Sequence, residues 1–487
     1  MSDLFSKYLD TVTLTDPIKC VGHVNRVQGL LIESKGPQAI IGEICRIELG
    51  NGKQVQAEVV GLKNETVQLM VYGDTEGIEI GCRVVASGAS LGVAVSNKLL
   101  GRILDPFGKA LDGKAEIDSS LRYPAMAESP DPFSRPRIKD RICTGIRAID
   151  GLLAVGRGQR LGIFSGSGVG KSTLLGMIAR NTNADVNVIG LIGERGRELN
   201  EFIENDLGPE GLARSVIIIT PSNSPPLARL RGAYVATAVA EYFRDQGLDV
   251  MFLFDSLTRF ARAQREIGLA TGEPAATRGY PPSMFDSMPK LLERSGTSKK
   301  GSITGFYTIL VDGDDMDEPV ADTVRGILDG HIVLSRNLAQ RYHYPAIDVL
   351  ASISRLANIV AGEESKKAVS VVRNLMADYA ESEDLINVGA YKQGSNANID
   401  AAIAKKEEID KFLLQAIDER SSIPETLRAL GEIAGVEIPE EEMAVFLPRE
   451  LLVENNDEVE EAEAEKSPLE LVSMEQNSEL SIPQILV

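Results

Sequence analysis

The most constraining feature of the chain is a glycine-rich stretch, Leu161–Leu175, which reads LGIFSGSGVGKSTLL. Its glycines allow backbone conformations that a side chain would forbid, so consecutive N–H groups can point at a polyphosphate on the positive end of a following helix. Lys171 would then reach the terminal phosphates, and Ser172 would offer its hydroxyl to Mg²⁺. The sequence therefore predicts a nucleotide site formed by Ser165, Gly166, Ser167, Gly168, Val169, Gly170, Lys171, Ser172 and Thr173.

One position departs from the usual pattern of such loops. The strict pattern has glycine at position 165, where this chain has Ser165. The flanking sequence favours the same interpretation, because an apolar strand precedes the loop and Leu174, Leu175 and Ile178 follow it at helical spacing. The alternative is an ordinary turn between a strand and a helix. Such a turn would not need the Gly-Lys-Ser-Thr ending.

Hydrophobic patterning divides the 487 residues into four parts. Residues 1–91 comprise an N-terminal segment and short alternating strands typical of a small β-barrel. Residues 92–361 begin with a connector rich in Gly, Pro and Asp and continue as apolar strands alternating with helices, which predicts an α/β nucleotide-binding domain with a mostly parallel sheet. Residues 362–437 carry apolar stripes of helical period over Ala368–Met376 and Ile409–Ile417, which predict a C-terminal helical domain. Residues 438–487 predict an acidic, disordered tail.

The charge balance excludes some classes of partner. The net charge is −20, and residues 438–487 alone carry 14 acidic and 2 basic side chains. This composition argues against a basic surface for nucleic acid. No apolar run approaches the roughly 18 residues that span a bilayer, and the N-terminus lacks the basic and apolar regions of a signal peptide. We therefore expect a cytoplasmic protein.

Two carboxylates follow predicted strands and are candidates for the chemistry. Asp255 ends the apolar strand Val250–Asp255 and is the candidate second ligand of Mg²⁺, with a strand-end turn aspartate as the alternative. Glu194 follows the strand Val188–Ile192. Because the ends of parallel strands gather at the nucleotide crevice, Glu194 is either a catalytic base or a solvated loop acid.

Assembled in this order, the motifs resemble those of the catalytic subunits of the F1/V-type rotary ATPases. Within that superfamily, the chain most closely resembles the flagellar and type III protein-export ATPases. The resemblance runs from about Val21 to Leu430 and implies a RecA-like nucleotide domain between a barrel and a helical domain. The stretches that carry it are Thr144–Gln159, Leu161–Leu175, Gly193–Glu198, Asp255–Phe260, Gly279–Ser283, Gly313–Pro319 and Tyr344–Arg355.

The resemblance implies roles that spacing cannot assign. Glu194 matches the glutamate that activates water, and Arg195 and Arg259 match arginines near the γ-phosphate. Tyr344 matches the aromatic position that packs on adenine, with a core tyrosine as the alternative. Arg355 matches the arginine finger that a neighbouring subunit supplies, which implies a homohexameric ring. The catalytic set is then Lys171, Glu194, Arg195 and Arg355.

Two segments favour the export branch. The sequence of Gly313–Pro319 resembles that of the export ATPases. Gly389–Asn398 occupies the position at which rotary β-type subunits carry an acidic loop. The resemblance implies an ATPase that uses ATP and Mg²⁺ to release export substrates from chaperones, unfold them and deliver them. It would act at the cytoplasmic face of the inner membrane. The implied partners are a peripheral-stalk regulator, a central coiled-coil stalk, export chaperones with their substrates, and a membrane export gate.

Three other functions are alternatives to this one. The first is the catalytic subunit of an ion-translocating rotary ATPase, in which two types of ring subunit alternate. The second is a nucleotide-binding scaffold without turnover, which the carboxylate of Glu194 disfavours. The third is a ring-shaped RNA translocase, which the charge balance disfavours.

Overall fold

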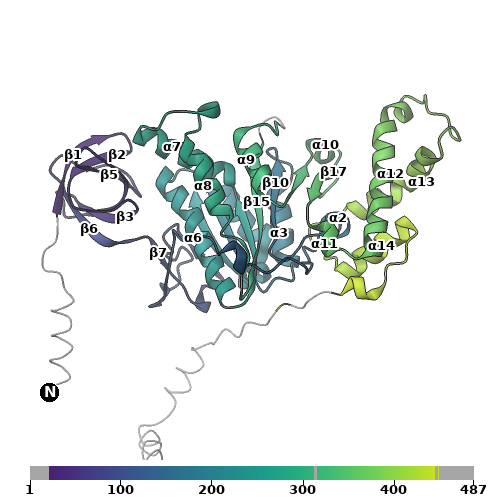
Figure 1. Ribbon diagram of the computed structural model, residues 1–487, viewed down its shortest axis with the longest axis horizontal. Helices are drawn as coiled ribbons and strands as arrows, with labels where there is room; N and C mark the ends of the chain where they lie inside the picture. Colours follow the sequence, from purple (N-terminus) through teal and green to yellow (C-terminus); the bar gives the residue numbers. More distant parts are fainter. Residues whose placement is uncertain (1–20, 312–314, 445–447, 449–487) are drawn as a thin grey trace, which may run out of the picture. The chain divides into compact units, whose positions relative to one another are not determined.

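The computed structural model describes residues 21–311, 315–444 and 448. These residues form an N-terminal barrel, a central α/β domain and a group of C-terminal helices (Figure 1), which confirms the predicted fold class. The predictions for the N-terminal segment 1–20 and for most of the tail 438–487 lie outside the described residues. Among the described residues, no helix is long and apolar enough to span a bilayer.

The barrel is closed by six antiparallel strands in the order β1-β2-β5-β4-β3-β6. Buried residues alternate with more exposed ones along β3, where Ile47 is buried between Arg46 and Glu48. Inward-facing apolar side chains fill the interior, and closure leaves no unpaired strand edge. The strands are β1 Val21–Gln28, β2 Leu31–Lys35, β3 Glu43–Glu48, β4 Gln54–Lys63, β5 Thr66–Val71 and β6 Arg83–Ser90.

A mostly parallel sheet forms the centre of the α/β domain. In the part of the chain that the structure describes, its strand order is β17-β16-β10-β15-β13-β11-β12-β8, with the short β14 beside β15. Along this order every pair is parallel except the first, in which the edge strand β17 runs antiparallel to β16. The strands are β8 Arg102–Leu104, β10 Arg160–Ser165, β11 Val186–Glu194, β12 Ser215–Pro221, β13 Asp249–Asp255, β14 Gly296–Thr297, β15 Ser302–Leu310, β16 Gly330–Leu334 and β17 Ile347–Ser354.

Helices cover both faces of this sheet, which explains why its strands are apolar throughout. Met251 and Leu253 of β13 pack in one core with α3 (Lys171–Asn181), whereas Phe254 points toward Ala236 of α6 (Pro226–Asp245). Figure 1 shows α6 with α7 and α8 on one side of the sheet and α3 on the other. The further helices of the domain are α2 Arg147–Leu152, α4 Gly196–Glu201, the π-helix η3 Phe202–Leu207, α5 Gly208–Ala213, α7 Leu257–Thr271, α8 Pro282–Leu292, α9 Pro319–Ile327, α10 Arg336–Gln340 and α11 Ala357–Val360.

The C-terminal domain contains α12 (Glu363–Asn387), α13 (Ala397–Leu413) and α14 (Ile423–Ala434). The helical pattern predicted to continue to Ile417 ends at Leu413, because Gln415 instead donates a hydrogen bond of 2.8 Å from Nε2 to Gly145 O. Ile438 and Met443 are buried in the same core. The packed part of the chain therefore extends at least to Met443.

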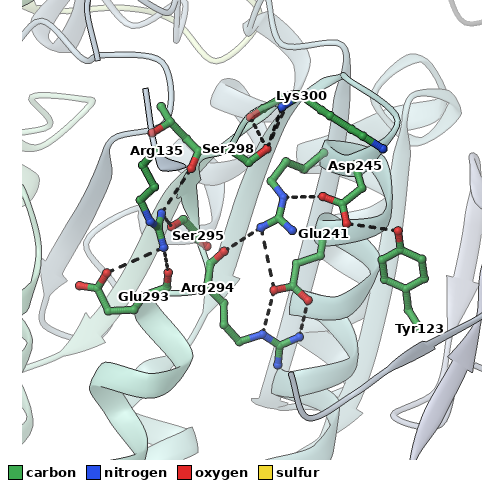
Figure 2. A network of polar contacts seen from close by, with 12 residues as sticks. Tyr123, Arg135, Glu241, Asp245, Glu293, Arg294, Ser295, Ser298 and Lys300 are labelled. Atoms are coloured by element: carbon green, nitrogen blue, oxygen red, sulfur yellow. Dashed lines mark hydrogen bonds and ion pairs between the residues drawn. The ribbon is translucent and has the colours of Figure 1, made fainter. Parts of the chain in front are cut away.

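A buried ion pair ties the connector between the first two domains to the sheet domain (Figure 2). Arg294 and Glu241 form two hydrogen bonds of 3.0 and 2.5 Å, and their side chains are only 1% and 5% exposed. Arg294 Nη1 also donates to Ala125 O in the connector at 2.6 Å. Charge pairing and hydrogen bonding together offset the cost of burying these ions.

We predict that Glu241→Ala destabilises the protein by about 3–5 kcal/mol, because it leaves the Arg294 guanidinium buried without its partner. The free energy of unfolding from urea denaturation measures this cost. Asp286→Ala is the matched control, since it removes an ion pair with Lys290 in which both side chains are 69% exposed. It should cost at most about 1 kcal/mol. Equal costs for the two variants would contradict the assignment.

Candidate active site

The glycine-rich loop follows β10 and opens α3. Gly168 and Gly170 have φ of +78° and +89°, which is the left-handed region that glycine enters without strain. Gly170 directly precedes Lys171, the first residue of α3. The first N–H groups of a helix have no partner within it, and the helix dipole favours an anion at this end. The loop therefore has the geometry that a phosphate site requires.

A cavity of about 440 Å³ lies against the loop and gathers residues from three strand ends and the helices beside them. Val169 is the predicted loop residue that does not line it, because its side chain is 2% exposed and packs in the core. The cavity is lined by Ser165, Gly166, Ser167, Gly168, Gly170, Lys171, Ser172, Thr173, Glu194, Arg195, Glu198, Glu201, Asp206, Arg259, Arg262, Leu310 and Val311.

Lys171 and Asp255 meet beside this cavity. Lys171 Nζ lies 2.5 Å from Asp255 Oδ1 and 3.7 Å from Glu194 Oε1. Burial alone would lower the pKa of Lys171, but the two carboxylates raise it overall, so the side chain stays an ammonium ion. Asp255 is 3% exposed at the end of β13. The loop cation is thus held by the carboxylate predicted to bind Mg²⁺.

Glu194 is a buried carboxylate with a raised pKa. Burial, and next the negative charge of Asp255, raise the pKa of Glu194 to about 7, and the nearby Lys171 partly offsets this. A carboxylate that titrates near neutral pH is a better proton acceptor there than an ordinary glutamate.

Three polar atoms at the cavity are buried and make no hydrogen bond within the described part of the chain: Ser165 Oγ, Glu194 Oε1 and Arg259 Nε. Buried polar atoms without partners are rare in native proteins because each costs about 1–3 kcal/mol. A hydroxyl, a carboxylate oxygen and a guanidinium nitrogen without hydrogen bonds thus lie at one cavity. This indicates that a bound polar ligand supplies the missing partners.

The two arginines predicted near the γ-phosphate both line the cavity, in different environments. The side chain of Arg195 is 71% exposed and donates to Glu198 Oε1 at 3.0 Å. Arg259 packs closely against the backbone of Gly193, where an added Cβ would lie 2.9 Å from Arg259 Cβ. Glycine at position 193 therefore leaves the space that Arg259 occupies.

Tyr344 lies at the edge of the loop. Its ring is 39% exposed, and its Cε1 atom would lie 3.4 Å from a Cβ placed on Gly170. Tyr344 is therefore partly exposed beside the loop. An exposed aromatic face at this position is suited to stacking on a nucleotide base.

Arg355 is the predicted site residue that the fold does not bring to the others. Because β17 runs antiparallel to β16, Ile347 lies level with Ser165 and Ser354 lies level with Leu161. Four residues of strand separate these levels, a distance of about 13 Å. Arg355 follows Ser354 and therefore lies at the opposite edge of the sheet from its own phosphate loop.

The structure adds residues that sequence reasoning missed. Thr308, fully buried in β15, donates from Oγ1 to Asp255 Oδ1 at 2.7 Å. Asp206 hydrogen-bonds to the Thr173 side chain, and Arg262 and Glu198 line the cavity. Only the register of β13 and β15, in which Phe254 pairs with Tyr307, reveals that Thr308 adjoins Asp255. That register is not visible in the sequence.

A phosphate loop at the carboxyl edge of a parallel sheet, with a strand-end aspartate and a buried glutamate, defines a P-loop nucleoside triphosphatase. Family models for the ATP synthase alpha/beta family match residues 24–88 (beta-barrel domain) and 145–354 (nucleotide-binding domain). A model for the T3SS EscN ATPase C-terminal domain matches residues 361–432.

Close relatives cover nearly the whole described chain. The chain is 60% identical over 438 residues to the flagellum-specific ATP synthase of Treponema pallidum (strain Nichols), covering 90% of this chain and 98% of that protein. It is 48% identical to the type 3 secretion system ATPase of Xanthomonas euvesicatoria, covering 85% and 93%. The structure of the assembled ATPase EscN from enteropathogenic E. coli matches with a TM-score of 0.81 and 42% identity, covering 85% and 100%.

The chain therefore belongs to the flagellar and type III secretion ATPases, and it is an ATP hydrolase of this protein-export type. The predicted family is confirmed, and the alternative of an ion-translocating rotary subunit is not favoured.

We predict that Thr308→Val lowers kcat/KM for ATP about tenfold or more, because it removes a hydrogen bond to a charged group and leaves Asp255 Oδ1 with one donor fewer. Steady-state phosphate release measures the effect. Thr308→Ser keeps the hydroxyl and is the control, so it should retain most of the activity. A Val variant with normal kcat/KM would show that Thr308 does not position Asp255.

Proposed function

We propose that the chain works as a homohexameric ring at the cytoplasmic face of the inner membrane. There it couples ATP hydrolysis to the release of export substrates from their chaperones, their unfolding and their delivery to a membrane export gate. The solved relative EscN is described as an assembled ATPase, and a second structure, with a TM-score of 0.79, describes EscN in complex with its central stalk EscO. A peripheral-stalk regulator and a central coiled-coil stalk complete the proposed machine.

The observation that best supports turnover is the set of unpartnered polar atoms at the cavity. Ser165 Oγ, Glu194 Oε1 and Arg259 Nε would each find a partner on a bound nucleotide or on its attacking water. The phosphates would lie on the N–H groups at the start of α3, and the Tyr344 ring would stack on adenine.

The donors at the loop also fit a divalent cation. Ser172, in the first turn of α3, and Asp255, at the end of β13, offer a hydroxyl and a carboxylate, which are the hard oxygen ligands that Mg²⁺ prefers. When bound, the ion would neutralise charge on the β- and γ-phosphates. Lys171 already lies against Asp255 and would place its ammonium group beside the same phosphate oxygens.

Glu194 would accept the proton of the attacking water. Its pKa of about 7 places much of the side chain in the basic form at neutral pH. Arg195 and Arg259 would hold the γ-phosphate oxygens, where a planar guanidinium can donate two hydrogen bonds at once.

The fold argues that Arg355 serves a neighbouring subunit. A side chain at the opposite edge of the sheet from its own loop cannot complete that loop's site without a large rearrangement. In a ring, the opposite edge of one subunit can face the phosphate loop of the next. Arg355 would then stabilise charge that develops in the transition state of the neighbour's reaction.

Mixed rings test this arrangement. Arg355→Ala and Glu194→Gln should each bind a fluorescent ATP analogue nearly normally yet hydrolyse ATP about 10³-fold or more slowly, because each removes an interaction made in the transition state. Mixing the two variants creates interfaces that contain both an intact Glu194 and an intact Arg355. Part of the wild-type turnover should return.

A titration of either variant into wild type is the control for sequential firing. If activity falls in proportion to the inactive fraction, and mixed rings shown to contain both variants still give no turnover, Arg355 does not act across the interface. Lys171→Ala should abolish nucleotide binding and turnover alike. The fold should persist by circular dichroism, but the melting temperature should fall, because the buried carboxylate of Asp255 loses its cation.

A further inference from the structure

The loop Ser129–Pro136 presents the most exposed of the large apolar side chains in the described part of the chain. The Phe133 ring is 99% exposed, whereas other exposed apolar residues reach at most 76% among aliphatic side chains and 86% among aromatic ones. Isolated exposed apolar residues are common on monomers, but an aromatic ring that the described part of its chain leaves almost fully exposed is unusual.

Hydrogen bonds and prolines within the loop restrict its backbone. Asp131 caps a short 3₁₀ turn, accepting from Phe133 N at 3.2 Å, and Ser134 Oγ donates to Asp131 O at 2.8 Å. Prolines at positions 130, 132 and 136 each restrict the backbone. The backbone conformation that exposes Phe133 is therefore fixed by residues of the loop itself.

Arg135 anchors this turn to the sheet domain. As Figure 2 shows, its guanidinium donates to the backbone carbonyl oxygens of Glu293 and Ser295, the latter at 2.7 Å. Thr297 Oγ1 donates to Pro136 O at 2.8 Å. Gly296 permits the close approach, because a Cβ there would lie 2.5 Å from Arg135 Nη1.

The anchor also places Phe133 at a particular edge of the sheet. Gly296 and Thr297 form β14, which pairs with the first residues of β15, so the loop lies at the amino-terminal edge of the parallel strands. Ile138 and Val360 both lie against Gly156, where an added Cβ would be 2.4 and 3.2 Å from them. The chain just after the Phe133 loop is thus close to the segment that follows Arg355.

We propose that Phe133 is an anchor residue of the ring interface and inserts into the neighbouring copy of this chain. A rigid aromatic side chain that is preorganised on its surface is the type of residue that dominates binding energy at protein interfaces. The edge that carries it also carries Arg355 and the half-exposed Ile353 and Ile359. The placement of Phe133 at an interface rests on the proposed ring. The contact of Phe133 with a second copy is tested without measuring ATP turnover.

The direct test replaces Phe133 with benzoyl-phenylalanine in the full-length chain, which keeps the aromatic ring and adds a photoreactive group. Ultraviolet light on assembled rings should give covalent dimers of the chain, and mass spectrometry should locate the crosslink in a second copy. The dimers should not form when the protein is diluted to monomers before irradiation. Assembled rings that give no crosslink between copies, or that crosslink only to a different protein, would overturn the proposal.

A substitution gives the matching energetic test. Phe133→Ser should leave the monomer's melting temperature unchanged, because the ring is 99% exposed in the described part of the chain. It should raise the concentration for half-maximal ring assembly, measured by mass photometry with ATP analogue present, about tenfold or more. Val388→Ser, at a residue 75% exposed in the C-terminal domain, is the control and should assemble normally. Normal assembly of Phe133→Ser, or an equal loss in both variants, would contradict the proposal.

Placing the photoreactive group at position 133 in an Arg355→Ala chain separates the two interface assignments. If the crosslink forms but mixed rings of the Arg355→Ala and Glu194→Gln variants regain no turnover, only the assignment of Arg355 as an arginine finger is contradicted. Rescue of turnover without any crosslink would fault Phe133 alone.

Discussion

The register of three parallel strands determines the site. Leu191 of β11 pairs with Asp255 of β13, and Phe254 of β13 pairs with Tyr307 of β15. This pairing brings Asp255 beside Thr308 and within 2.5 Å of Lys171. A slip of one residue would turn Asp255 to the other face of the sheet, because successive strand side chains alternate. The geometry of the chemistry therefore depends on backbone pairing as much as on the loop itself.

A local irregularity in the same sheet directs Glu194. The pairing of β11 with β12 shifts register between Ile192 and Glu194, and the intervening Gly193 has φ of +79°. Such an irregularity re-aims the side chain that follows it, and it leaves the space that Arg259 fills. Glu194, the proposed catalytic base, and Arg259, the proposed phosphate ligand, are thus both positioned by Gly193.

The sequence predicts the fold and most of the cavity lining, and it does so for local reasons. Strand periodicity and the Gly-Lys-Ser-Thr ending are visible within a few residues, so the barrel, the parallel sheet and the loop follow from short stretches. Thr308 could not be found in this way, since its role depends on a pairing across 53 residues. The end of α13 was misplaced because a tertiary contact of Gln415 with Gly145 overrides the apolar pattern that continues to Ile417. The predicted boundaries at 91, 361 and 437 remain predictions.

The direction of β17 gives the subunit its two unlike edges. A further parallel strand would have ended beside the phosphate loop, so that Arg355 would have adjoined its own Lys171. Instead the antiparallel β17 carries the chain from Tyr344, near the loop, to Arg355 at the far edge. One edge thus holds the phosphate loop and the other holds Arg355 and the Phe133 turn. A contact between two different edges is head to tail, and such a contact closes into a ring when the repeated rotation completes a full turn. In the ring that we propose, an active site divided between copies is a consequence of reversing one edge strand in an otherwise parallel sheet.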